Sequence, residues 1–194
     1  MLKKLALVAL LAMPLSAFAS SIDVANRGGV LSGSSSGLSL SDSIVFMYAG
    51  TVGSNLGSLN FTTGAFTSGD AEMGGTLAAG GSFQIVGNGT AGVPNGVIFS
   101  GSFSSATWTL VTLENGTHNY ILSGGLVDPS GQVGAATQIT INTGTALFQG
   151  STNLSSGDTN LVVAPEPSTL GLFATGLVGL AGVARRRNPG RPLV

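Results

Sequence analysis

The segment that decides the fold runs Thr107-Trp-Thr-Leu-Val-Thr-Leu-Glu-Asn-Gly-Thr-His-Asn-Tyr-Ile-Leu-Ser123. Residues that favour strands dominate both halves, and Asn115-Gly116 separates the two halves. Asn-Gly suits a two-residue type I′ turn, because both central residues of that turn need a positive φ. The segment therefore predicts an antiparallel β-hairpin. A two-residue turn fixes the register, which pairs Glu114 with Thr117, Leu113 with His118, Val111 with Tyr120, and Leu110 with Ile121.

This register distributes the apolar side chains of the hairpin over two faces, since successive residues of a strand point to opposite sides. A ribbon that is apolar on both sides needs cover on both sides, which favours a two-sheet sandwich over a single open sheet. One face would hold Trp108, Leu110 and Ile121, and the other Val111, Leu113, Tyr120 and Leu122.

The flanking sequence repeats this pattern of short apolar or alternating runs separated by turn residues. The runs are 43–48, 58–61, 82–86, 97–100, 107–114, 118–122, 137–141 and 146–148. None of them continues with the 3.6-residue apolar period of a helix. We therefore predict one all-β domain over residues 43–164, an antiparallel β-sandwich or a barrel-like fold. Residues 20–42 are rich in Gly and Ser, and we expect an irregular segment that leads into this domain.

Composition and charge exclude several classes of function. The chain of 194 residues has 31 glycines, 8% charged residues and no cysteine. Without cysteine it can have no disulfide, no thiolate zinc site and no cysteine nucleophile. Residues 20–164 hold one basic and seven acidic residues, a net charge of −6. Such a segment cannot neutralise phosphates, so we expect no nucleic-acid partner.

The first 19 residues have the pattern of a bacterial secretion signal. Lys3 and Lys4 give a short positive region, and an uncharged apolar run follows over residues 5–15. Ala17 and Ala19 then place small residues where a signal peptidase requires them. We expect a signal-peptide helix over residues 1–19, export by the general secretion machinery, and cleavage by signal peptidase after Ala19.

The last 30 residues combine three features in a fixed order. They are Pro165, Glu166 and Pro167, the uncharged apolar stretch 168–184, and the cluster of Arg185, Arg186 and Arg187. The apolar stretch is at the short limit for a transmembrane helix. Because positive residues stay on the cytoplasmic side, the β domain should lie outside the cytoplasm. The simplest interpretation of the tail is a permanent membrane anchor.

This order of features also resembles the PEP-CTERM sorting signal of exported bacterial proteins. The two prolines favour an extended segment that cannot join the membrane helix, which keeps Glu166 accessible. The resemblance implies recognition by an exosortase, a membrane peptidase that cuts near the Pro-Glu-Pro and releases or re-attaches the protein. It also implies an association with exopolysaccharide or biofilm. A similar C-terminal motif occurs on some ice-binding proteins.

Two short patterns fit enzyme motifs but lack the structural context of those motifs. Residues 33–37 fit a nucleophile elbow within a Gly/Ser-rich stretch, and residues 87–92 fit a dinucleotide fingerprint that Pro94 follows instead of a helix. His118 is the single histidine, and we expect it to be exposed at a strand end. Calcium binding has no support from spacing. The acids considered for it are Asp70, Glu72, Asp128 and Asp158. We predict no catalytic, cofactor or metal site.

The sequence leaves three functional hypotheses open. The leading one is a non-enzymatic envelope or extracellular-matrix protein that is sorted at the membrane through its tail and released into exopolysaccharide or biofilm. The alternative is a carbohydrate- or ice-binding surface module, which requires Trp108, Tyr48 and Tyr120 to be exposed on one flat face. The third is a secreted hydrolase, which requires clustered acids or a His-acid pair.

Overall fold

The computed structural model describes residues 20–131, 133–163 and Gly176. The chain divides into two compact units, of which one is Ser21–Val163 and the other combines Met1–Ser20 with Ala164–Val194. The predicted signal-peptide helix and, apart from Gly176, the predicted transmembrane helix over 168–184 lie outside the described residues. Among the residues that are described, no helix has the length and apolar character needed to cross a membrane.

Twelve strands make up the described part of the larger unit. They are β1 (Ser20–Arg27), β2 (Val30–Ser34), β3 (Gly37–Tyr48), β4 (Thr51–Thr62), β5 (Phe66–Asp70), β6 (Gly74–Leu77), β7 (Gly80–Asn88), β8 (Asn95–Thr112), β9 (His118–Val127), β10 (Val133–Gly144), β11 (Ser151–Asn153) and β12 (Ser156–Val163). Short connections between them follow from the many glycines, which supply positive φ angles at the turns.

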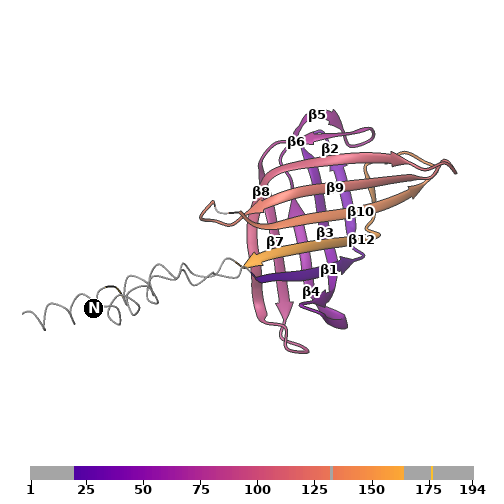
Figure 1. Ribbon diagram of the computed structural model, residues 1–194. Coiled ribbons are helices and arrows are strands. Elements are labelled where there is room, and N and C mark those ends of the chain that lie inside the picture. The colour runs from indigo at the N-terminus through magenta and orange to yellow at the C-terminus, as the bar shows by residue number, and fades with distance from the viewer. Residues whose placement is uncertain (1–19, 132, 164–175, 177–194) are drawn as a thin grey trace, which may run out of the picture. The chain divides into compact units, whose positions relative to one another are not determined.

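Eight of these strands close into an antiparallel barrel (Figure 1). Neighbours around the wall are β1, β12, β10, β9, β8, β7, β4 and β3, and β3 pairs with β1 to complete the ring. The first and last strands, β1 and β12, lie side by side and run in opposite directions. The predicted all-β antiparallel fold is therefore confirmed in its barrel form, and the preference for a sandwich is wrong.

Four short strands extend the wall of the barrel. β2 pairs with the first half of β3, and β11 pairs with β2. β6 pairs with the middle of β8, and β5 pairs with β6. The long strands β3 and β8 therefore have two different neighbours along one of their edges.

The predicted irregular segment over 20–42 is instead β1, β2 and the first half of β3, so that prediction is wrong. Val24, Leu31 and Leu40 are buried, and the residues beside them in each strand are more exposed. Gly28 has a φ of 65° and makes the turn from β1 to β2, so the glycine content does not prevent strands here. The partners of β1 are β12 and β3, and the local sequence gives no sign of this pairing.

Two other predicted runs have different roles in the structure. Residues 97–100 and 107–114 belong, up to Thr112, to one continuous strand, the 18-residue β8. Residues 146–148 lie in the loop between β10 and β11, where Phe148 is buried against the barrel core. The apolar run therefore marks a buried loop side chain and not a strand.

The predicted hairpin is present as β8 and β9, but its register differs by one residue. The N–H of Gly116 donates to the carbonyl oxygen of Leu113, and the N–H of Leu113 donates to that of Thr117, both at 2.9 Å. Asn115 Oδ1 accepts a further hydrogen bond from the N–H of Thr117 at 3.0 Å. The loop therefore has three residues, with a glycine at positive φ in the position of a bulge, and not two.

This shift of one residue exchanges the faces of the hairpin. Trp108 is opposite Leu122, and both share the inner face with Tyr120; all three are at most 1% exposed. Val111 and Leu113 are on the outer face and are 36% and 42% exposed. The hairpin is thus covered on one side only, as the wall of a barrel requires.

Aromatic side chains fill much of the barrel interior. Phe61, Phe83 and Phe103 pack together with ring centroids 5.7–6.0 Å apart. Trp108 stacks on Tyr120 at 5.2 Å. An eight-stranded barrel is just wide enough for its side chains to fill, and these rings form such a packed core.

The polar ends of two of these aromatic residues fix two loops to the barrel. Trp108 Nε1 donates to the carbonyl oxygen of Ala71 at 2.8 Å, and the Tyr120 hydroxyl donates to that of Glu72 at 2.6 Å. The N–H of Phe148 donates to the Tyr120 hydroxyl at 3.0 Å. The β5–β6 turn and the loop after β10 are therefore held by buried side chains.

Candidate functional site

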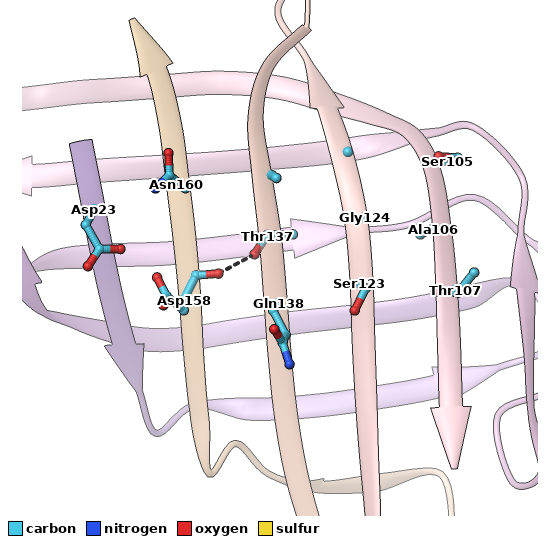
Figure 2. Close-up of a pocket in the computed structure, with 12 residues that line it drawn as sticks. Asp23, Ser105, Ala106, Thr107, Ser123, Gly124, Thr137, Gln138, Asp158 and Asn160 are labelled. Carbon is cyan, nitrogen blue, oxygen red and sulfur yellow. Dashed lines mark hydrogen bonds between the residues drawn. The ribbon is translucent and has the colours of Figure 1, made fainter. Parts of the chain in front are cut away.

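The outer wall of the barrel has a hollow of about 570 Å³ that extends over β8, β9, β10, β12 and β1 (Figure 2). The side chains that line it are small or polar, and most of them are exposed to solvent. On the outer face they are Asp23, Ser105, Thr107, Ser123, Gly125, Ala136, Gln138, Asp158 and Asn160. The hollow therefore opens to solvent and does not reach the core.

Strand register explains why polar side chains gather here. Thr107 is opposite Ser123, Ser123 is opposite Gln138, and Gln138 is opposite Asp158. β1 then adds Asp23 beside Asp158 (Figure 2). One row of polar side chains therefore crosses five adjacent strands. We call it the polar row, and its members are Thr107, Ser123, Gln138, Asp158 and Asp23 (Figure 2).

A second row explains the depth of the hollow. Ser105 is opposite Gly125, Gly125 is opposite Ala136, and Ala136 is opposite Asn160. The two central positions of this row have no side chain beyond Cβ. Space therefore remains above the sheet beside the polar row.

Asp23 and Asp158 form a carboxyl pair at one end of the polar row. Burial raises the pKa of Asp158 above its ordinary value of 3.8, and a hydrogen bond with the Asp23 side chain and the charge of Asp23 raise it further. A hydrogen bond from the N–H of Thr159 acts in the opposite direction. Two adjacent carboxylates repel each other, so the neighbouring Asp23 favours the protonated form of Asp158.

This pair was not predicted from the sequence, although Asp158 was among the acids considered for calcium. Asp23 and Asp158 are distant in the sequence, and only the contact between the first and last strands brings them together. Neither residue lies in a predicted strand. Polar residues at alternate positions, such as Asp158 and Asn160, could have suggested a strand face. They could not have shown that β1 and β12 are neighbours.

Two of the other acids considered for calcium, Asp70 and Asp128, stabilise local turns. Asp70 Oδ1 accepts hydrogen bonds from the N–H groups of Glu72 and Met73 at 2.9 and 2.7 Å. Asp128 Oδ1 accepts from the N–H and the hydroxyl of Ser130 at 2.8 and 2.6 Å. In the described part of the chain, no three acidic or histidine side chains converge in the way that a metal ion requires.

His118 lies at the start of β9, so the expected position at a strand end is correct. Its side chain is partly buried and not fully exposed as expected. Its Nδ1 lies 3.0 Å from the hydroxyl of Thr112, which is a neutral partner and not the acid of a triad. Of the two enzyme-like patterns, residues 33–37 span the end of β2, the turn after it and the start of β3. Residues 87–92 form the end of β7 and the loop after it. Neither pattern leads into a helix.

The aromatic residues that a flat binding face would need are not exposed together. Trp108 and Tyr120 are buried in the core, and Tyr48 is partly buried against it. The aromatic face required for the carbohydrate- or ice-binding alternative is therefore not formed.

The predicted cleavage and sorting residues lie outside the described residues. They are Ala17, Ala19, Pro165, Glu166, Pro167, Arg185, Arg186 and Arg187. The nearest described residues are Ser20, which begins β1, and Val163, which ends β12. Both predicted processing regions are therefore adjacent in sequence to the two neighbouring strands that close the barrel.

Comparison with known proteins identifies the tail. Residues 163–187 match a motif of exported, membrane-associated proteins, which an exosortase sorts to the cell surface. It is the PEP-CTERM protein-sorting motif, so the resemblance seen in the sequence is confirmed. The match covers the tail and not the barrel. Neither the comparison with curated proteins nor that with solved structures found a match to the chain.

Proposed function

We propose that the barrel is the exported part of a non-enzymatic envelope or extracellular-matrix protein. Its tail holds the chain at the membrane through the helix 168–184, with the barrel outside the cytoplasm. The exosortase then cuts near Pro165, Glu166 and Pro167 and delivers the barrel into exopolysaccharide or biofilm. The observation that carries this proposal is the PEP-CTERM match over residues 163–187.

Two properties of the barrel support a structural role outside the cell. The pairing of β1 with both β12 and β3 leaves no open edge between the first and last strands, and closure of this kind protects a sheet against uncontrolled pairing with other chains. The segment 20–164 has only eight charged residues, so hydroxyl and amide groups provide most of its contact with water. Such a surface is compatible with a hydrated polymer matrix.

Two groups of the described part of the barrel bear on the non-enzymatic role. His118 has a hydroxyl partner, and the Asp23–Asp158 pair lies on an open wall without a buried cleft around it. We find no observation there that favours ice binding.

The proposal can be tested with a tail variant in the cells that export the protein. Replacing Pro165, Glu166 and Pro167 by Ala should leave the protein in the membrane fraction with its tail attached, while the unchanged protein reaches the matrix fraction. Pro129→Ala, in the β9–β10 connection, is the matched control and should be sorted normally. If the tail variant distributes like the unchanged protein, or if the unchanged protein never leaves the membrane fraction, the proposal is wrong.

A further inference from the structure

We infer that the hollow over β8, β9, β10, β12 and β1 binds an uncharged, hydroxyl-rich chain of the neutral polysaccharide class. The inference rests on the proposed function, because it names a ligand class for the exported barrel. It adds a specific site on the barrel wall, which the sorting motif does not describe. This site would bind through hydroxyl and amide side chains, and it is distinct from the aromatic face of the earlier alternative, which is not formed.

The first argument is the hydrogen-bonding capacity of the hollow. Five of its side chains make no hydrogen bond within the described part of the chain. They are Ser105, Thr107, Ser123, Gln138 and Asn160. Hydroxyl and amide groups both donate and accept hydrogen bonds, so they can pair with the hydroxyl groups of a sugar in either direction. The carboxyl pair at the end of the polar row adds strong acceptors for such hydroxyl groups.

The second argument is charge and polarity. No basic residue lines the hollow, and Asp23 and Asp158 would repel an anionic polymer. No aromatic or large aliphatic side chain lines it either, so an apolar ligand would gain little. These two exclusions leave a polar ligand without negative charge.

The third argument is the spacing of the polar row. Adjacent strands lie about 4.8 Å apart, so the five side chains from Thr107 to Asp23 span about 19 Å across the strands. A linear polymer that lies across the strands would meet one polar side chain per strand. Gly125 and Ala136 leave the space beside this row in which the polymer could lie. Several weak hydrogen bonds in a row suit a ligand with repeated hydroxyl groups.

The test uses the purified full-length protein in native gels that contain a dissolved polymer, where binding slows migration. The neutral probes are dextran, pullulan and galactomannan, and the charged probes are dextran sulfate and diethylaminoethyl-dextran. We expect at least one neutral polymer to retard the protein and dextran sulfate to have no effect.

Two variants and one control place the binding in the hollow. Ser123→Ile fills the centre of the polar row with a good strand former and should abolish the retardation. Ser54→Ile makes the same change at an exposed position of β4 outside the hollow and should not alter it. Gln138→Ala removes one amide without adding bulk and should weaken binding about threefold to tenfold, as expected for one lost hydrogen bond.

Three results would overturn the inference. These are the absence of retardation by all three neutral polymers, retardation by the cationic polymer alone, and retardation that survives Ser123→Ile and Gln138→Ala unchanged. Sorting is not involved in this binding measurement. A negative binding result is therefore distinct from a failure of the proposed function. A protein that binds no polymer but is still cut and released would refute the site only.

Discussion

At the scale of single residues, Tyr120 joins three parts of the barrel through one hydroxyl group. It donates to the carbonyl oxygen of Glu72 and accepts from the N–H of Phe148, at 2.6 and 3.0 Å. Tyr120→Phe leaves the carbonyl oxygen of Glu72 and the buried N–H of Phe148 without this partner. We expect the free energy of unfolding to fall by about 1–3 kcal/mol, measured by urea denaturation.

Tyr48→Phe is the matched control for this change. The Tyr48 hydroxyl makes no hydrogen bond within the described residues, so its loss should alter the free energy of unfolding by less than about 0.5 kcal/mol. Equal effects of the two substitutions would contradict the anchoring role of Tyr120.

The Asp23–Asp158 pair predicts a pH dependence of stability. The pKa of Asp158 is raised in the folded state, so the folded protein binds a proton more tightly than the unfolded chain. The free energy of unfolding should therefore decrease as the pH rises from 3.8 through the raised pKa. Asp158→Asn removes this decrease and should stabilise the protein at neutral pH by less than about 1 kcal/mol, because Asp158 is largely exposed and solvent screens its charge.

Unfolding curves between pH 3 and pH 7 can measure this effect. Asp23→Asn should also reduce the slope of the free energy of unfolding against pH, because it removes the like charge beside Asp158. A slope that both substitutions leave unchanged would show that the two carboxyl groups are not coupled.

At the scale of elements, the β8–β9 loop depends on one glycine with a positive φ. Gly116 has a φ of 78°, and a Cβ at this position would meet no other atom within 4 Å. Gly116→Ala should therefore cost about 1 kcal/mol of stability through backbone strain alone. Gly116→Asn should cost less, because Asn adopts this conformation more readily. Thermal unfolding of both variants measures the difference, and equal losses would indicate a steric cause.

The sequence could locate most elements but not their partners. Asn115-Gly116 correctly marked the turn between β8 and β9, yet Asn-Gly fits both a two-residue loop and a three-residue loop with a bulge. The choice between them shifts the register by one and moves Tyr120 from one face to the other. β1 and β2 were missed because Gly and Ser are poor indicators of strands. For β1, the partner β12 is also distant in the sequence.

The candidate site was less predictable than the fold. Its residues are Ser, Thr, Gly, Ala and Gln, which have no distinctive spacing along the chain. They form a site only because five strands align them in register. Asp23 and Asp158 meet only when the barrel closes. By contrast, the sorting tail is a local signal, and its order of features was sufficient to recognise it.

At the scale of the whole molecule, closure of the barrel protects the amide hydrogens of β1 and β12 from exchange as well as those of the other barrel strands. Amide hydrogens in β1 and β12 should exchange as slowly as those in β8 and β9, because all of them pair on both sides. Hydrogen exchange followed by mass spectrometry checks this expectation. Fast exchange confined to β1 and β12 would indicate a sheet that is open at this seam.

The central claim is that the exported barrel is sorted through its PEP-CTERM tail. The most direct test is the intact mass of the protein recovered from cells with and without the exosortase. We predict a C-terminus near Pro165, Glu166 and Pro167 in cells that have the peptidase, and an uncut tail at the membrane in cells that lack it. An identical C-terminus in both kinds of cell would contradict the account and leave a plain membrane anchor.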